Sequence, residues 1–170
     1  MCKASPHSRE FFQKRIGRAH RPRSSPTLLP TVAGFANFYE QEAVFEHGPP
    51  TSALNRLRDT YRPVLEAGLT TTPEALLADF SHVEKPMEKT LLASLCHGWS
   101  AGPCYFLPRH VLGIRPAEPG FRRVGIWPRL GDLAWARGSV PTPHGLFEVE
   151  WENNDGEVRG TFRLPEGIES

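Results

Sequence analysis

The chain has 170 residues, of which 39% are hydrophobic and 23% charged, with a net charge of +1. This composition is typical of a soluble globular protein with one domain of ordinary size or two pieces of smaller ones, rather than of a disordered chain. The small net charge argues against a dedicated nucleic-acid-binding protein, and no apolar run is long enough to predict a membrane-spanning helix.

The charge is unevenly distributed. Residues 1–30 carry seven basic side chains and one acidic one, so this segment has a charge of +6 and the remainder a charge of −5. Residues 1–32 lack sustained periodicity and are rich in Arg, Ser and Pro, which predicts a basic, disordered leader. The alternative is a contact with nucleic acid or an acidic surface, but Phe11 and Phe12 alone make a poor stacking platform.

Three cysteines, Cys2, Cys96 and Cys104, do not form a disulfide framework. Reduced thiols predict a cytoplasmic protein, and no convincing export signal precedes residue 36. The spacing of Cys96, His97, Cys104 and His110 does not fit a metal site, and Cys96 lacks an evident electropositive neighbourhood that would make it a nucleophile. We therefore expect neither a metal nor a cofactor.

Helical periodicity begins at Phe35. Aromatic residues from Phe35 to Phe45 share one arc, with Glu42 in its middle, where a carboxylate needs a partner or a cavity. After the Gly48-Pro49-Pro50 turn, Thr51 or Ser52 is expected to cap a second helix that Gly68 ends. The apolar stripe of this second helix contains Leu54, Leu57, Tyr61, Val64 and Leu65. The two helices predict an αα-hairpin, and a third helix is expected over Ala101–Leu112 with Gly113 as its C-cap.

After Gly113 the period changes to two. Four strands are predicted, over Phe121–Trp127, Leu133–Val140, Leu146–Glu152 and Glu157–Leu164. In the third strand, apolar side chains alternate with glutamates, and Asn154-Asp155-Gly156 predicts the turn to the fourth. Arg159 and Arg163 are expected to face the glutamates. The predicted fold class is therefore α+β, with an antiparallel, sandwich-like sheet at the end.

Two polar features between the helices and the strands are candidates for chemistry. Glu74 follows three threonines and a proline, and it is either a catalytic carboxylate or an exposed acid in the first turn of a helix. His97, in a glycine-containing loop before Trp99, either hydrogen-bonds the backbone or contacts a sugar hydroxyl beside the indole. Residue types and spacing leave these alternatives open.

Several stretches of the chain, in order and over about residues 33–165, resemble the inverting bacterial and fungal α-L-rhamnosidases. The stretches that carry this resemblance are Asn37-Phe38-Tyr39, Gly68-Leu69-Thr70-Thr71-Thr72-Pro73-Glu74, Cys96-His97-Gly98-Trp99-Ser100-Ala101-Gly102-Pro103, Val111-Leu112-Gly113-Ile114-Arg115-Pro116, Pro128-Arg129-Leu130-Gly131-Asp132-Leu133 and Gly138-Ser139-Val140-Pro141-Thr142-Pro143-His144-Gly145.

The resemblance implies an architecture and site roles. Residues 33–113 correspond to the last helical hairpins of an (α/α)6 six-hairpin toroid, and residues 114–170 to the C-terminal β-sandwich domain. Glu74 matches the family's general base, His97 its rhamnose-binding histidine, and Trp99 a supporting pocket wall. The residue two before Glu74 is usually aromatic in the family, whereas here it is Thr72. The family's general acid lies on earlier helices, to which no part of this chain corresponds.

These observations support two hypotheses about function. The first is the C-terminal part of an α-L-rhamnosidase, acting on a rhamnose-containing glycoside and inactive by itself because the general-acid region is missing. The second is a non-catalytic carbohydrate-binding or assembly module. Either allows a complementing chain or a homo-oligomer as partner. A basic-tailed interaction protein is a weaker third hypothesis.

Overall fold

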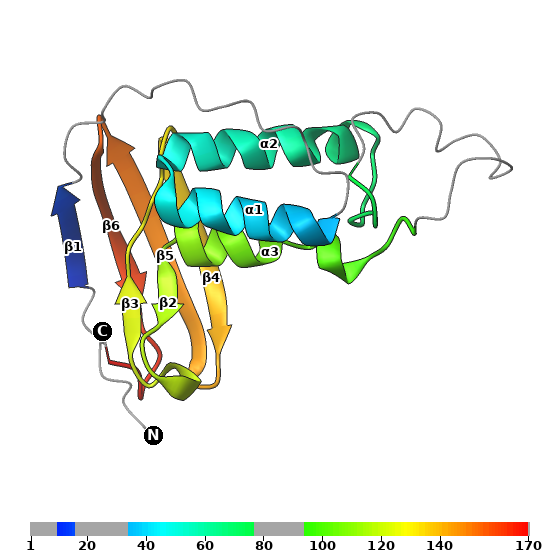
Figure 1. Cartoon of the computed structure of the whole chain (residues 1–170). Helices are drawn as coiled ribbons and strands as arrows, with labels where there is room; N and C mark the ends of the chain where they lie inside the picture. The colour runs from blue at the N-terminus through cyan, green and yellow to red at the C-terminus, as the bar shows by residue number, and fades with distance from the viewer. Residues whose placement is uncertain (1–9, 16–33, 77–93, 170) are drawn as a thin grey trace, which may run out of the picture. The chain divides into compact units, whose positions relative to one another are not determined.

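The computed structural model describes residues 10–15, 34–76 and 94–169, with the backbone alone for residues 10–15 (Figure 1). The chain divides into two compact units. The helical unit lies within residues 22–106, and the sheet unit combines residues 107–170 with residues 1–21. The described residues contain helices and antiparallel sheets, which confirms the predicted α+β class. The six-hairpin toroid and the domain limits at residues 32 and 113 remain predictions.

The helical unit is built on an αα-hairpin of α1 (Gly34–His47) and α2 (Pro50–Glu66), followed later by the short helix α3 (Pro103–Phe106). Figure 1 shows α1 and α2 running side by side. The helix α2 begins at Pro50, whose missing N–H costs nothing in a first turn, and no side chain caps it. The expected cap at Thr51 or Ser52 is therefore wrong.

The C-terminus of α2 is as predicted, because Gly68 ends the helix. Gly68 adopts a positive φ of 69°, and its N–H donates to the Leu65 carbonyl at 3.0 Å, while the Leu69 N–H donates to the Val64 carbonyl at 3.2 Å. This pair of bonds is a Schellman motif. Leu69 also packs against a small core of Val64 and Leu76, so the chain after α2 is fixed where it turns toward Glu74.

The buried face of α1 differs from the predicted aromatic arc. The buried residues are Gly34, Asn37, Gln41 and Phe45, whereas Phe35 and Tyr39 are 54% and 60% exposed. Phe38 and Phe45 both stack on Phe106, with ring centroids 5.0 and 5.3 Å apart. Because the contacts with Phe106 set the rotation of the helix, Phe35 and Tyr39 remain at the surface.

Two further expectations about the helical unit have clear outcomes. Glu42 has a partner, since the Tyr105 hydroxyl donates to its carboxylate at 3.1 Å. Leu65, expected in the apolar stripe of α2, is instead 73% exposed, while Ala53, Leu54, Leu57 and Val64 are buried.

No described helix is long and apolar enough to cross a membrane.

The segment predicted as one helix over Ala101–Leu112 changes character along its length. It forms α3 and then a π-helical turn, Leu107–Val111, closed by a 2.9 Å bond from the Leu112 N–H to the Leu107 carbonyl. Gly113 follows with φ of 76°, as its predicted C-cap role requires. A Cβ at Gly113 would lie 2.1 Å from the carbonyl carbon of Trp127, so only glycine fits this close approach.

The sheet unit contains a four-stranded antiparallel sheet with the strand order β1-β6-β5-β4. Its members are β4 (Trp135–Thr142), β5 (Gly145–Asn154), β6 (Glu157–Arg163) and β1 (Glu10–Arg15). A separate two-stranded hairpin consists of β2 (Ile114–Pro116) and β3 (Val124–Ile126). Sequence periodicity did not predict β2, and the strand expected over Phe121–Trp127 is shortened to β3.

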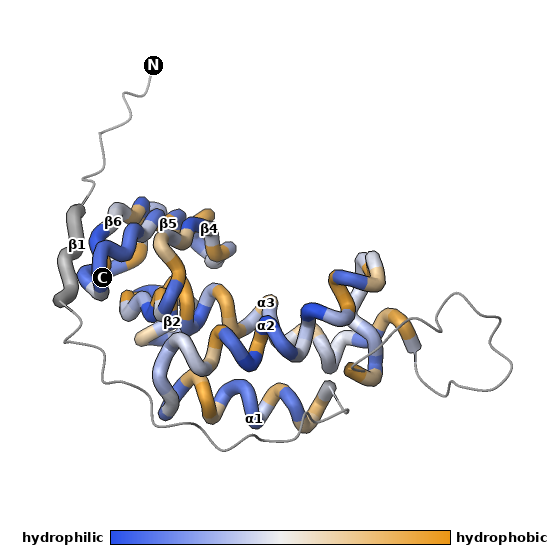
Figure 2. Tube along the Cα trace, turned by 90° about the horizontal axis from the view of Figure 1, so that it is seen from above, coloured by the Kyte–Doolittle hydropathy of each residue, from blue (hydrophilic) through white to orange (hydrophobic). Residues whose placement is uncertain are grey.

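The central strand β5 alternates as predicted. Phe147, Val149 and Trp151 are at most 2% exposed, and the glutamates between them are exposed. Figure 2 shows hydrophobic and hydrophilic residues interspersed in β4, β5 and β6. Arg163 lies opposite Glu148 and pairs with it at 2.9 Å, whereas Arg159 lies opposite Glu152 but pairs with Glu157.

Part of the predicted leader is ordered in the structure. The backbone of β1 pairs antiparallel with β6, from Glu10 opposite Phe162 to Arg15 opposite Glu157. The unpaired edge of a sheet leaves backbone N–H and C=O groups without hydrogen-bond partners. The backbone of β1 provides such partners for the edge of β6. The structure therefore describes a strand at these six residues, and the disordered leader stays a prediction for the remainder of residues 1–32, which lies outside the described part of the chain.

Candidate functional site

Two irregular segments of the helical unit lie against each other and bring Glu74 and His97 together. The Glu74 N–H donates to the Ser94 carbonyl and the His97 N–H to the Thr72 carbonyl, each at 2.7 Å. The Thr72 hydroxyl returns a 3.1 Å bond to the His97 carbonyl. The threonine run before Glu74 therefore acts as a hydrogen-bonding partner for the loop of His97.

The Glu74 carboxylate is half-buried and held in one orientation. Its Oε2 accepts a 2.9 Å hydrogen bond from the Ser94 N–H. Residues 74–76 are not helical, so within the described residues Glu74 does not occupy the first turn of a helix. A carboxylate with one oxygen anchored to the backbone is suited to hold a water or a ligand hydroxyl with the other.

Trp99 connects the carboxylate segment to the histidine. Its indole Nε1 donates to the Glu74 carbonyl at 3.1 Å, and the His97 imidazole stacks on the indole with ring centroids 4.0 Å apart. Glu74, His97 and Trp99 are thus neighbours in the structure.

Both interpretations of His97 fit its surroundings. Its Nδ1 accepts from the Trp99 N–H at 3.4 Å, which caps the 3-10 turn Gly98–Ser100. This bond assigns the proton to Nε2. Among the described residues Nε2 has no hydrogen-bond partner, so one ring nitrogen bonds the backbone and the other is available to a ligand.

Ser100 and Tyr61 hold the loop of His97 and Trp99 in place through hydrogen bonds. The sequence alone did not predict this supporting role for either residue. Ser100 is fully buried, and its carbonyl accepts a 2.7 Å bond from the Tyr61 hydroxyl of α2. Its own hydroxyl lies 3.5 Å from the Glu74 carbonyl. A Cβ at Gly34 of α1 would lie 1.9 Å from this hydroxyl oxygen, so both helices fix the loop.

The environment of Tyr61 predicts a measurable pH effect. Burial, and secondarily the nearby Cys104, raises the pKa of Tyr61 from 10.0 to about 12. The protonated phenol is favoured in the folded state, so its stabilising contribution is complete below pH 10 and is lost as the pH rises toward 12. We expect an absorbance titration of the three tyrosines to contain one phenol that ionises near pH 12.

The Tyr61→Phe variant identifies this phenol. The late step should be absent from its titration, and the unfolding free energy of the variant should depend less on pH between 10 and 12. A late step that persists in Tyr61→Phe would mean that another tyrosine is the buried one.

Beside Trp99 the surface is hollowed by a pocket of about 240 Å³. Aromatic rings form most of its wall, and small residues form the rest; the lining consists of Phe35, Phe38, Tyr39, Trp99, Gly98, Ala101 and Gly102. Neither Glu74 nor His97 lines it. The i, i+4 spacing of Phe35 and Tyr39 places both rings on one side of α1, but the same spacing also predicts a core stripe.

Comparison with known proteins shows which proteins this chain is similar to. Residues 113–170 match the bacterial alpha-L-rhamnosidase C-terminal domain. This part of the sheet unit is therefore similar to a rhamnosidase C-terminal domain. An alpha-L-rhamnosidase of Alteromonas sp. (strain LOR) is 45% identical over 42 residues, which is 24% of this chain and 5% of that protein.

The likeness to rhamnosidases extends beyond the C-terminal domain. A GH78-family rhamnosidase of Bacillus sp. GL1 has 36% sequence identity and a TM-score of 0.61, covering 72% of this chain and 13% of its own. The alfa-L-rhamnosidase of Aspergillus terreus, at 23% identity, shares the fold with a TM-score of 0.62 over 79% of this chain and 16% of its own. The predicted relation to the C-terminal part of the α-L-rhamnosidases is confirmed, and the chain spans a small share of their length.

Proposed function

We propose that the chain supplies one side of an inverting α-L-rhamnosidase site, with Glu74 as the general base. The observation that carries this proposal is the arrangement in which Trp99 donates to the Glu74 backbone while His97 stacks on its indole. It gathers a fixed carboxylate, an available imidazole nitrogen and an aromatic face, which are the groups that bind and activate a sugar substrate.

In this mechanism Glu74 activates a water molecule. The carboxylate takes a proton from the water as its oxygen attacks the anomeric carbon, and the glycosidic C–O bond breaks on the opposite face. A second carboxylic acid, roughly 6.5–9.5 Å away in inverting enzymes, protonates the leaving oxygen. His97 Nε2 donates to a rhamnose hydroxyl, and the Trp99 indole limits the movement of the sugar ring.

The acid that completes the reaction is proposed to come from a complementing chain or from the part of a rhamnosidase that this chain does not cover. Without a general acid, water must protonate the leaving group, and the rate falls by about 10²–10⁴-fold. We therefore predict no measurable hydrolysis by the 170-residue chain alone of methyl α-L-rhamnoside, whose alkoxide leaving group needs a proton. Release of L-rhamnose, followed by chromatography, measures this directly.

Steady turnover by the isolated chain would contradict the proposal, provided that Glu74→Gln abolishes it. That result would mean that an acid within this chain, for example Glu42, completes the site.

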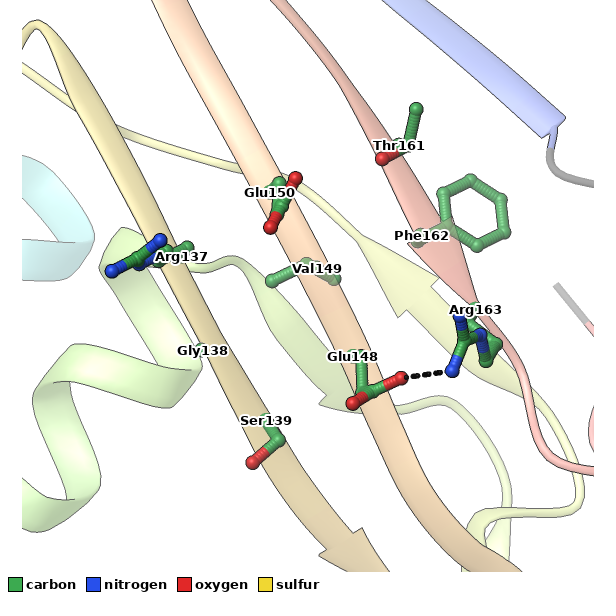
Figure 3. Close-up of a pocket in the computed structure, with 9 residues that line it drawn as sticks. All are labelled: Arg137, Gly138, Ser139, Glu148, Val149, Glu150, Thr161, Phe162 and Arg163. Carbon is green, nitrogen blue, oxygen red and sulfur yellow. Dashed lines mark ion pairs between the residues drawn. The ribbon is translucent and has the colours of Figure 1, made fainter.

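A second candidate function, a non-catalytic carbohydrate-binding module, is favoured by the polar face of the sheet. A hollow of about 530 Å³ there is lined by side chains of both charges from β4, β5 and β6, including Arg137, Glu150 and the ion pair of Glu148 with Arg163 (Figure 3). Trp135 lies nearby, 60% exposed, with Arg137 5.5 Å from its ring. The test is to add L-rhamnose and follow the chemical shifts of the protein by NMR. Changes that Glu150→Ala removes and His97→Ala leaves intact would favour this candidate over the first.

A further inference from the structure

The two edges of the meander β4-β5-β6 are protected in different ways. The strand β4 has no strand partner on its outer side among the described strands, and it contains Pro141, which has no N–H to donate, and the exposed Arg137. Proline and charge are usual protections of an edge. The strand β6 contains no proline, and its outer edge is covered by the backbone of β1 (Figure 1). Without β1, the edge of β6 would be open to pairing with another strand.

The residue types of β1 match those of β6 poorly. The register places the charged Glu10 opposite Phe162 and the charged Lys14 opposite Val158. Both of these β6 residues belong to the core, at 7% and 2% exposure. Cross-strand pairs stabilise a sheet when both residues are apolar or oppositely charged, and neither kind occurs at these two positions. The pairing of β1 therefore depends mainly on its backbone, which another extended strand can replace.

The sequence of β6, by contrast, is complementary to itself. In an antiparallel pair of two β6 strands centred on Gly160, Glu157 lies opposite Arg163 of the second copy. In the same pair, Val158 lies opposite Phe162 of the second copy, and both are on the buried face of the strand. Two ionic pairs and two apolar pairs then flank the centre symmetrically, and each pair stabilises the contact.

Other registers of this pair lose the complementarity. A shift of one residue brings residues of the core face opposite residues of the solvent face. A shift of two residues brings Arg159 opposite either Arg159 or Arg163 of the second copy, depending on its direction. Like charges directly opposite each other are destabilising. The register centred on Gly160 is therefore favoured over its neighbours.

From these observations we propose that the edge of β6 joins two copies of this chain in an antiparallel pair, and that β1 covers the same edge in the single copy. The backbone N–H and C=O groups of β6 bond either β1 or the second copy, so the two strands compete. Arg163 already pairs with Glu148, and Glu157 with Arg159, so in the dimer each gains a second partner across the interface. This inference does not depend on the proposed function, because neither Glu74 nor His97 takes part in it.

The first part of the test removes β1 from the edge in the full chain. Phe11→Pro together with Phe12→Pro removes two adjacent backbone N–H groups, one of which faces β6 in an antiparallel ladder. Ala4→Pro together with Ser5→Pro makes the same two changes before β1 and is the matched control. Because the competing strand is lost, we expect the dissociation constant of the dimer, measured by sedimentation velocity, to fall about tenfold relative to the control.

Charge reversal then identifies the interface. In the chain without the β1 pairing, Glu157→Arg and Arg163→Glu each bring like charges opposite each other in the dimer. Each variant alone should therefore dimerise about tenfold more weakly. An equimolar mixture of the two should regain the affinity, because every arginine then meets a glutamate. Arg122→Glu, at an exposed arginine outside β6, is the control and should change nothing.

Amide hydrogen exchange tests the competition directly. In the intact chain, the β6 amides that face β1 should exchange slowly. In the proline variant they should exchange quickly at low protein concentration and slowly in the dimer. The β6 amides that face β5 should remain slow throughout, which shows that the sheet is folded.

The remaining outcomes would overturn the inference. A folded proline variant that stays monomeric would show that the edge does not join two copies. Fast exchange at all outer amides of β6 in the intact chain would show that β1 does not cover the edge. A dimer that neither charge reversal weakens would have its interface elsewhere, and growth beyond the dimer would contradict a closed two-fold pair. If the proline variant does not fold, the charge variants in the intact chain decide, since only their mixture should associate as tightly as the parent.

Discussion

Replacing Trp151 by alanine is expected to lower the unfolding free energy of the sheet unit by about 3–5 kcal/mol. Trp151 is 2% exposed at the middle of β5, so its removal leaves a large cavity. Its indole Nε1 also donates to the Leu112 carbonyl at 3.0 Å, and alanine leaves this buried acceptor without its partner. Urea denaturation followed by near-ultraviolet circular dichroism measures the change.

Trp135 provides a matched control on the neighbouring strand. It is 60% exposed on β4, and Trp135→Ala should change the unfolding free energy by no more than about 0.5 kcal/mol. Trp151→Phe should lie between the two, because it keeps most of the ring but loses the bond to Leu112. Equal losses in Trp151→Ala and Trp135→Ala would contradict the assignment of Trp151 to the core.

The sheet was predictable because each strand of the meander has one face toward the core and one toward water. In β5 this divides Phe147, Val149 and Trp151 from the glutamates between them, and the turn residues fix the register with β6. The short strand β2 has three residues, too few for a period of two to be recognised. The strand β1 depends on a distant partner edge, which no local pattern encodes.

The rotation of α1 was not predictable from its own sequence. Asn37 and Gln41 are buried, while the more hydrophobic Phe35 and Tyr39 are exposed. Periodicity assumes that the apolar side chains face the core. Here the contacts of Phe38 and Phe45 with Phe106 determine which face is buried, and those contacts are tertiary.

The candidate site was predictable only as separate parts. Glu74 and His97 were identified by residue type and by resemblance, but the backbone bonds that join their segments follow no periodic pattern. Ser100 and Tyr61 look like ordinary residues in the sequence. Their importance comes from one buried carbonyl and one hydroxyl that meet between α2 and the loop.

Glu74→Gln is expected to have the largest effect on catalysis. An amide cannot take a proton from water, so the proposed general base is lost, while the amide oxygen can still accept the bond from the Ser94 N–H. Loss of a general base lowers kcat by about 10²–10⁴-fold. Because the side chain keeps its shape, KM should change little.

The loss of kcat is measurable in a chimera. In this chimera, the segment of the Bacillus sp. GL1 rhamnosidase that aligns with this chain is replaced by the corresponding residues of this chain. That solved structure aligns with 72% of the chain, so the junctions can be chosen on its coordinates. The proposal requires the remainder of the Bacillus protein to supply the acid and the far side of the pocket. Glu66→Gln, at an exposed carboxylate in the last turn of α2, is the matched control.

The most direct test of the account is therefore kcat for 4-nitrophenyl α-L-rhamnoside in this chimera. We predict that the unsubstituted chimera and Glu66→Gln turn over at similar rates, and that Glu74→Gln lowers kcat by about 10²–10⁴-fold with little change in KM. A folded chimera without activity, or one in which Glu74→Gln and Glu66→Gln have the same kcat, would contradict the assignment of Glu74 as the general base.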